Sequence, residues 1–339
     1  MTRLQDAKAL VRRFYDALDR ATAEEVAKVM ADFTPKAYRW RGSYPMNELH
    51  GGQKVVDIFW SPLKSAFVPI QRRQNIFFAG TNRLDNDRTV WVASMGHLLG
   101  HFHAHWLGIR PSHKMAFLRY CEFHRVADGK IQETALHFDV MSLLAQIGSR
   151  VVPEPTGVVT VTPGPQTQDG LLFDQHPAED GEATLDLIER MIDRLIGAGV
   201  KTTIEDLQSD WREDMLWWGP AGIGASYTHQ GYLKGHARPF EAGLEFVRHN
   251  GHVVRLGEGN YGGFFGYPSM TMRAKGGYMG LTSAGDKTAD MRIVDLYRRD
   301  GDKLAENWIF IDHLWFLKQL GVDLLQRHID MTTPADTFL

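Results

Sequence analysis

Apolar residues in the first part of the chain recur every three or four positions, which is the spacing of an amphipathic helix. The pattern predicts three helices, at about residues 4–19, 23–33 and 55–66. Thr22 and Glu25 have the spacing of a capping box, which satisfies the free amides at a helix start. A turn-rich stretch at 38–44 separates the second predicted helix from the third.

From residue 76 onward the pattern changes to aromatic and β-branched runs separated by Gly, Asn, Asp or Pro, which is typical of strands. The predicted strands are residues 76–79, 90–97, 99–107, 116–126 and 131–138. The second half repeats this order. Its predicted helices are residues 185–196, 204–210 and 239–247, and its predicted strands are residues 253–256, 262–267, 270–274, 293–298 and 304–311. Helices followed by a run of strands indicate an α+β fold without alternating βαβ units.

A long internal repeat agrees with this order. Residues 119–148 align without a gap on residues 292–321, and each copy reads strand, turn, strand, aspartate and a short apolar helix. The aligned pairs are Arg119 with Arg292, Glu122 with Asp295, Glu133 with Glu306, Asp139 with Asp312 and Gly148 with Gly321. The two copies lie about half a chain apart, far more than one solenoid repeat, so the pattern indicates a duplicated domain.

The repeat predicts one domain at residues 1–150 and another at residues 183–330, which suits a length of 339 residues. The segment between them, residues 151–182, contains Pro153, Pro155, Pro163, Pro165 and Pro177. That proline density excludes a long helix and marks a linker. The segment is partly apolar, so we expect some of it to pack, as an added edge strand. Thr202 and Glu205 have capping-box spacing before the helix at 204–210.

Charge and cysteine content limit the partners and the compartment. The formal net charge of −3 gives no electrostatic reason to expect nucleic acid or an anionic membrane. The sequence has no apolar run long enough to span a bilayer, and its first residues read as a charged amphipathic helix, not as a secretory signal. Cys121 is the single cysteine, so no intrachain disulfide can form and a cytoplasmic location is expected.

Short motifs in both halves resemble the SnoaL-like polyketide cyclases of the NTF2-like superfamily. They are residues 128–131 (DGKI), Asp139 and residues 143–148 (LLAQIG) in the first half, and Asp312 and residues 316–321 (FLKQLG) in the second. Residues 279–285 also resemble a hairpin of that family, and residues 107–112 are their weaker counterpart.

The resemblance implies two tandem NTF2-like cones, each with N-terminal helices packed on a curved, mostly antiparallel sheet that encloses a pocket. It also implies a cofactor-free enzyme in which an aspartate moves a proton during ring closure. Other members of the superfamily isomerise, dehydrate, open epoxides or only bind. Fusion of two copies implies an intrachain pseudo-dimer, with further pairing into a homodimer left open.

Asp139 and Asp312 are the main candidates for acid/base chemistry. Each stands where the last strand of its half turns into the last helix. One interpretation is a general acid/base at the floor of a pocket. The other is a helix N-cap, a role that aspartate fills well. Alternation along the strand places Glu133, Ala135 and His137 on the face of Asp139, and Glu306, Trp308 and Phe310 on the face of Asp312.

A histidine-rich strand suggests two further roles. His101, His103 and His105 would point the same way in a strand, with His97 nearby. Two of these imidazoles and Glu122 could hold a metal ion. Polar pocket lining and simple surface exposure are the alternatives.

Two acidic residues on the preceding strands pair with ring-bearing neighbours, Glu122 with His124 and Asp295 with Tyr297. Either pair could face a pocket and assist proton transfer. Arg119 and Arg292 could instead be their partners on an exposed sheet surface, and this surface pairing is the interpretation we favour.

Aromatic residues are candidates for pocket walls, although most aromatics in such a sequence belong to the core. The candidates are Tyr15, Trp40, Tyr44, Trp60, Trp106, Trp217, Trp218, Tyr278 and Trp308. The sequence contains no dinucleotide, P-loop, zincin or nucleophile-elbow motif, which weighs against those chemistries.

The sequence therefore predicts a cofactor-independent enzyme that abstracts a proton next to a carbonyl and cyclises or isomerises a small apolar substrate. Asp139 is expected to act as acid/base with help from His137 or His103, and Asp312 is the second candidate. The expected substrate-binding residues are Tyr15, Trp40, Trp60, His101, His105, Trp106, Glu122, Trp218, Tyr278 and Trp308, with no metal and no cofactor. The alternatives are a binding protein that holds a hydrophobic ligand without chemistry, and a metal-dependent variant centred on the histidines.

Overall fold

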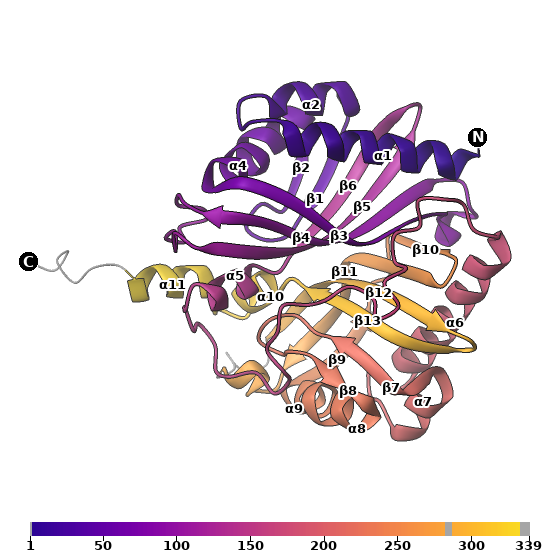
Figure 1. Ribbon diagram of the computed structural model, residues 1–339. Helices are drawn as coiled ribbons and strands as arrows, with labels where there is room; N and C mark the ends of the chain where they lie inside the picture. Colours follow the sequence, from indigo (N-terminus) through magenta and orange to yellow (C-terminus); the bar gives the residue numbers. More distant parts are fainter. Residues whose placement is uncertain (1, 282–286, 333–339) are drawn as a thin grey trace, which may run out of the picture.

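The computed structural model describes residues 2–281 and 287–332, and it contains two sheets with helices around them (Figure 1). The elements of the first half are α1 (Arg3–Arg20), α2 (Val26–Phe33), β1 (Arg39–Gly42), β2 (Glu48–His50), α3 (Gly52–Val55), a π-helical turn (Val56–Trp60), α4 (Ser61–Ala66), β3 (Phe67–Thr81), a 3-10 turn (Arg83–Asp85), β4 (Val90–Phe102), β5 (Met115–Ala127), β6 (Lys130–Phe138) and α5 (Val140–Gln146).

The second half uses a similar order. Its elements are α6 (Ala178–Gly197), α7 (Ile204–Asp210), β7 (Trp211–Trp218), β8 (Ser226–Tyr227), α8 (Thr228–Tyr232), a π-helical turn (Leu233–Ala237), α9 (Arg238–Gly243), β9 (Leu244–His249), β10 (Val254–Glu258), β11 (Tyr261–Ala274), a 3-10 turn (Tyr278–Gly280), β12 (Thr288–Asp300), β13 (Lys303–Ile311), α10 (His313–Gln319) and α11 (Leu324–Thr332).

The two sheets have matching strand orders. The first runs β2-β1-β6-β5-β4-β3, and the second runs β8-β7-β13-β12-β11-β10, with β9 also paired to β11. In each sheet the short strand that follows the first helices lies parallel to the last strand, β1 with β6 and β7 with β13. The other long neighbours in each sheet are antiparallel. The presence of helices together with largely antiparallel sheets confirms the expected combination of α and β structure. The two separate sheets fit two domains.

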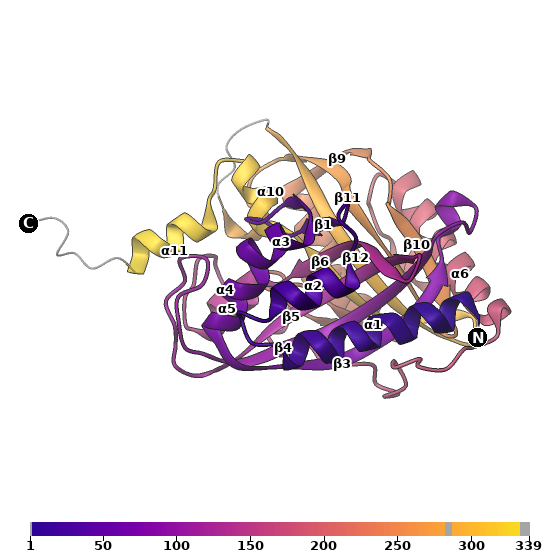
Figure 2. The same ribbon diagram turned by 90° about the horizontal axis from the view of Figure 1, so that it is seen from above.

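The sheets pack against each other in the middle of the molecule, and helices cover their outer sides. In Figure 1 the first half is the upper one, and α1, α2 and α4 cover the outer side of its sheet. The second half is the lower one, and α6 to α9 lie on the outer side of its sheet. Figure 2 shows the first half from above. A core of buried side chains from both sheets fills the space between them, including Phe78, Phe123, Phe265, Trp308 and Phe310. We call this group the inter-sheet core. The opposite faces of the same strands point toward the helices of their own half, and we call each such interior a cup.

Buried polar contacts also join the halves. The ammonium group of Lys8 on α1 lies 2.5 Å from a carboxylate oxygen of Glu258 on β10. The other oxygen of Glu258 accepts a hydrogen bond of 2.8 Å from the amide of Ala79 on β3. Removing one partner of a buried ion pair lowers the stability of the fold, because the remaining charge is buried without compensation.

Several predicted elements have different bounds in the structure. The strands expected at 90–97 and 99–107 are one strand, β4, which ends at Phe102. The helix expected at 239–247 ends at Gly243, and β9 begins at once. The capping box of α7 is made by Thr203 and Asp206, one residue later than expected. Part of the linker does pack, because Val158 pairs with Ala225 and Leu171 with Phe77 in isolated bridges.

Two further expectations concern the family-like hairpin and membrane-spanning helices. The hairpin resembling the family motif, residues 279–285, lies mostly outside the residues that the structure describes. In the described part of the chain, no helix is long and apolar enough to cross a membrane.

Replacing Phe265 with alanine tests whether the inter-sheet core supports the fold. Its ring is fully buried, 5.2 Å from the ring of Phe123 and 5.8 Å from that of Trp91. We expect Phe265→Ala to lower the free energy of unfolding by about 3–5 kcal/mol, measured by urea denaturation. The control Ile58→Ala removes an apolar side chain that is 40% exposed and should cost less than about 1 kcal/mol. Equal losses in the two variants would contradict this role.

Candidate functional site

Asp139 caps α5 and Asp312 caps α10, the helix that directly follows the last strand of each half. One oxygen of Asp139 accepts a 3.0 Å hydrogen bond from the amide of Ser142 at the start of α5. One oxygen of Asp312 accepts a 3.3 Å bond from the amide of Trp315 at the start of α10. The helix-cap interpretation of both residues therefore has direct geometric support.

The second oxygen of each aspartate reaches into the other half. Asp139 accepts a 2.8 Å bond from the amide of Ala221, and Asp312 accepts a 2.9 Å bond from the amide of Tyr44. Burial raises the pKa of Asp312, against the charge of Arg292, whose guanidinium lies 3.3 Å away. Both carboxylates thus accept hydrogen bonds from both halves, which matches the helix-cap interpretation, and Asp139 also lines a cavity between the halves.

The strand face of Asp139 is the inter-sheet face. The ring centroid of His137 lies 6.3 Å from that of Phe265 and 6.4 Å from that of Tyr267. Burial lowers the pKa of His137 to about 3. Neither of its ring nitrogens has a hydrogen-bond partner among the described residues. Glu133 forms an ion pair of 2.9 Å with Arg41. The alternation along the strand was predicted correctly, but this face packs against the other sheet and not into a cup.

The histidine cluster lies on the surface. β4 ends at Phe102, and the side chains of His101, His103 and His105 are exposed. His101 bonds to the carbonyl of His113 at 2.9 Å. Among the described residues, no group of three or more His, Cys, Asp or Glu side chains is arranged to hold a metal ion. Of the three sequence interpretations, surface exposure matches His101, His103 and His105, whereas His97 is buried and lines a cavity between the halves.

The first cup contains a buried ion pair. Arg72 on β3 lies 2.6 Å from Glu122 on β5, and both side chains are almost fully buried. Burial would raise the pKa of Glu122, but Arg72 and the hydrogen bond from His124 outweigh it and lower the pKa to about 2. The guanidinium of Arg72 also stacks over the ring of Tyr15 at 3.9 Å. Glu122 therefore faces the cup, and its partner is Arg72, so the favoured pairing with Arg119 on an exposed surface is wrong.

A chain of hydrogen bonds continues from this ion pair. The hydroxyl of Tyr15 lies 2.8 Å from Nε2 of His124, and Nδ1 of His124 lies 2.8 Å from the hydroxyl of Thr134. All of these groups are buried. Each side chain of this network thus has at least one polar partner, and one terminal nitrogen of Arg72 is left without a partner among the described residues.

The second cup holds a carboxylate that no cationic side chain contacts in the described part of the chain. Asp295 on β12 accepts a 2.9 Å hydrogen bond from the side-chain amide of Asn307 on β13 and a further bond from Tyr297. Burial raises the pKa of Asp295 to about 7, and the bonds from Asn307 and Tyr297 offset this only in part. The surface interpretation is wrong here too, because Asp295 is buried and Arg292 pairs with Asp312.

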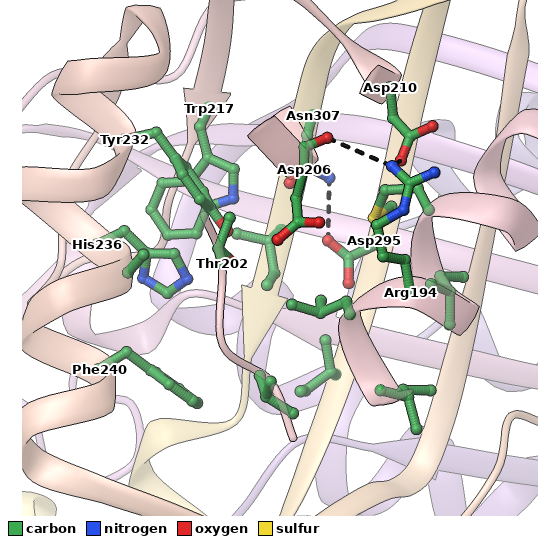
Figure 3. A pocket seen from close by; sticks show the side chains of 18 of the residues that line it. Arg194, Thr202, Asp206, Asp210, Trp217, Tyr232, His236, Phe240, Asp295 and Asn307 are labelled. Atoms are coloured by element: carbon green, nitrogen blue, oxygen red, sulfur yellow. Dashed lines mark hydrogen bonds and ion pairs between the residues drawn. The ribbon is translucent and has the colours of Figure 1, made fainter. Parts of the chain in front are cut away.

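A cavity of about 130 Å³ lies beside Asp295 inside the second cup (Figure 3). Its aromatic wall comes from Trp217 on β7, Tyr232 on α8, and His236 and Phe240 on the following turns. His236 stacks on Trp217 with 4.0 Å between ring centroids, and burial lowers its pKa to about 3, so the ring is neutral near pH 7. The Nδ1 atom of His236 has no hydrogen-bond partner among the described residues.

On the other side of the cavity, Arg194 of α6 bonds to Asp210 of α7 at 2.5 Å, as the dashed lines in Figure 3 show. Thr202 and Asp206 lie near them in the same lining. The cavity therefore has an aromatic side, a polar side and one carboxylate whose pKa lies near neutrality. A carboxylate with such a pKa can both accept and return a proton at neutral pH.

The expected aromatic residues fall in different places. Tyr15, Trp40 and Trp60 lie in the interior of the first half, together with Trp106, whose ring centroid is 6.4 Å from that of Phe138. Trp308 belongs to the inter-sheet core, against which Trp218 packs. Tyr278 is bonded to His313 at 2.9 Å, and Tyr44 stacks with Lys318. Only Trp217 of the expected wall lines the cavity of the second cup.

No motif or pattern in the sequence marks Tyr232, His236 or Asn307 as a site residue. Tyr232 and His236 follow β7 in a segment without a strong periodic signal. Asn307 stands one position away from the row that includes Glu306 and Trp308, and so it faces the opposite side of β13. The sequence did mark Asp295, because it aligns with Glu122 in the internal repeat, and this was the one feature that pointed to the interior of the second half.

A sequence model of the SnoaL-like polyketide cyclases matches residues 86–147. This match confirms the resemblance for that part of the first half, and the second copy stays a prediction. No curated protein matches the chain.

Solved structures also resemble parts of the chain. A candidate SnoaL-like polyketide cyclase from Jannaschia sp. CCS1 is 17% identical and has a TM-score of 0.35, over 43% of this chain and 95% of its own. TsrD from Streptomyces laurentii is 14% identical with a TM-score of 0.35, over 44% and 98%. An NTF2-like protein from Burkholderia thailandensis E264 is 20% identical with a TM-score of 0.32, over 44% and 99%.

Removing the cap at Asp139 should weaken the fold. Asp139→Ala leaves the amides of Ser142 and Ala221 without their acceptor, so we expect the free energy of unfolding to fall by about 2–3 kcal/mol in thermal or urea unfolding. Asp139→Asn keeps a side-chain oxygen and should cost less than about half of that. Equal stability of the alanine variant and the parent would rule out the capping role.

The ionisation of Asp295 should make stability depend on pH. Its pKa is about 7 in the folded protein, against an ordinary value of 3.8, so the folded state holds this proton more tightly than the unfolded state. The stabilisation is complete below about pH 4 and is lost as pH rises through 7. Asp295→Asn cannot ionise, so its stability relative to the parent should increase by about 2–3 kcal/mol between pH 5 and pH 8.

Urea unfolding at both pH values measures this difference. Asp302→Asn, on the exposed turn between β12 and β13, is the matched control and should show no pH-dependent gain. A constant difference between parent and Asp295→Asn across this range would show that Asp295 is not buried as a neutral acid.

Proposed function

We propose that the chain is a cofactor-independent enzyme that abstracts a proton next to a carbonyl group, with Asp295 in the second cup as its general base. The observation that supports this most is a buried carboxylate beside a cavity, with a pKa of about 7. A general base works best when its pKa lies near the operating pH, and apolar surroundings are one way to obtain such a pKa. Asp139 and Asp312 take structural roles in this proposal, in place of the catalytic roles expected from the sequence.

The cavity favours a small and flat substrate. Its volume of about 130 Å³ is close to that of an engineered cavity of about 150 Å³ that binds benzene in another protein. Trp217 and Phe240 supply an apolar surface on which a ring can stack. A carbonyl compound of roughly one ring would fit, which agrees with a small apolar substrate.

Developing negative charge on the carbonyl oxygen needs a hydrogen-bond donor. Tyr232 lines the cavity, and burial raises its pKa well above the usual value, so its hydroxyl stays protonated at neutral pH. The neutral imidazole of His236, with Nδ1 unpaired among the described residues, is a second candidate donor. We assign Tyr232 or His236 to the carbonyl oxygen and Asp295 to the α-carbon proton, with cyclisation or isomerisation as the outcome.

The first cup is proposed to be structural. Glu122 is held ionised by Arg72 with a pKa of about 2, which makes it a weak base. This division fits two tandem NTF2-like cones, at residues 1–150 and 183–330, of which the second holds a buried carboxylate that no cation contacts among the described residues. The sheet-to-sheet packing supports an intrachain pseudo-dimer, and the single cysteine supports a cytoplasmic location.

The alternative is a non-catalytic protein that binds a hydrophobic ligand. The aromatic wall of the second cup favours it, because such a wall would hold a ligand without any reaction. The two functions differ in whether protons are exchanged.

Deuterium exchange at the α-carbon of cyclohexanone in D₂O, followed by NMR, tests the proposal. We expect the parent protein to accelerate the exchange and Asp295→Asn to lose about 100-fold or more of that rate. The rate should rise with pH through about 7 and then level off, because only ionised Asp295 accepts the proton. Asp302→Asn should retain the parent rate.

Two results would contradict the proposal. Exchange in Asp295→Asn as fast as in the parent would exclude Asp295 as the base. Saturable binding of cyclohexanone without any acceleration would instead support the binding protein.

A further inference from the structure

A second and larger cavity, of about 340 Å³, lies between the two halves and outside the second cup. One wall is formed by β4, β5 and α5 of the first half, through His97, Arg119 and Met141. The loop after β7 forms the opposite wall, and the linker segment 151–162 covers the remaining side. We call this space the inter-half cavity.

Arg119 is the cation buried in its wall, and the buried Asp139 lines the same cavity. The side chain of Arg119 is 3% exposed, and its guanidinium lies 4.1 Å from the centre of the Phe310 ring. Two of its N–H groups donate to the carbonyls of Trp218 and Gly219, at 3.1 and 3.3 Å. A guanidinium has five N–H donors, and Nε of Arg119 has no partner among the described residues. Burial lowers the pKa of Arg119 to about 10, so the group still carries its charge at neutral pH.

The matching residue of the second half shows what Arg119 lacks. Arg292 lies 3.3 Å from the carboxylate of Asp312 and donates to Asn47 at 2.8 Å. In the described part of the chain, Arg119 forms no such ion pair, and Asp139 acts on it only at longer range. Both oxygens of Asp139 are already engaged by the amides of Ser142 and Ala221. One buried positive charge is therefore left without an anion in contact.

The rest of the lining is mostly apolar. Met141, Val151 and Pro153 contribute hydrocarbon surface, and Phe117 lies beside His97, with 5.8 Å between ring centroids. His97 is the residue opposite Arg119 on the neighbouring strand, and burial lowers its pKa to about 4, so it adds no second charge near pH 7. The exposed pair Arg150 and Glu154 at the rim satisfies itself. The carboxylate of Asp139 also lines the cavity, but backbone amides hold both of its oxygens, so Arg119 is the group with an N–H donor to spare. A ligand with one negative charge and an apolar body suits this lining.

We propose that the inter-half cavity is a binding site for a small organic carboxylate with an apolar body, recognised by Arg119. Arginine pairs with carboxylates through two parallel hydrogen bonds, and such bonds are stronger in a desolvated site. The site is separate from the cup that contains Asp295, and it does not depend on the chemistry proposed there.

Phenylacetate is a suitable probe, with 2-phenylethanol as its neutral counterpart. Protein labelled with ¹³C at the methionine methyl groups distinguishes the two cavities, because Met141 lines the inter-half cavity while Met191 and Met270 line the second cup. We expect phenylacetate to shift the Met141 signal saturably and 2-phenylethanol to bind about tenfold or more weakly.

Two variants test the assignment to Arg119. Arg119→Met removes the charge at similar length and should weaken phenylacetate binding about tenfold or more. Ala145→Trp, at an exposed position of α5 that lines the cavity, should block binding without removing any buried group, and so it remains informative if Arg119→Met does not fold. Shifts confined to Met191 and Met270, no shift with phenylacetate, equal affinity for the alcohol, or unchanged binding in Ala145→Trp would each overturn the proposal.

Discussion

The central strands of this protein must bury both of their faces, and most of the structure follows from that constraint. One face of β4, β5 and β6 packs on the matching face of β11, β12 and β13, while the other face closes a cup under helices. Side chains alternate along a strand, so each residue belongs either to the contact between halves or to a cup interior. A shift of one position moves a residue from one environment to the other.

This constraint explains why two equivalent carboxylates behave differently. Glu122 and Asp295 occupy matching positions and both face a cup, where burial opposes ionisation. The first cup supplies Arg72, which lies 2.6 Å from Glu122 and keeps it ionised. The second cup supplies the neutral amide of Asn307, which leaves Asp295 with a pKa of about 7. The difference in chemistry therefore depends on one cation contributed by β3, which lies two strands away from β5 in the same sheet.

Much of the fold could be predicted from the sequence, and the site only in part. Hydrophobic periodicity located most helices and strands, and the repeat indicated two units of the same order. Periodicity also grouped Asp139 with His137 correctly, but it could not tell which face looks into a cup, because both faces are buried and apolar. The partner of Glu122 was missed because Arg72 stands fifty residues earlier in the chain on β3. Contacts between distant strands depend on register, which local patterns do not specify.

The aspartates that cap α5 and α10 exchange partners across the molecule. Asp139 completes its hydrogen bonds with the backbone of the second half, and Asp312 does so with the backbone of the first. Neither half can therefore complete the hydrogen bonds of its capping aspartate alone. For a nascent chain on the ribosome, the N-terminal portion has to wait for residues near 221 before Asp139 acquires its full set of donors. The reciprocal exchange thus ties completion of folding to synthesis of both halves, and it favours keeping them in one polypeptide.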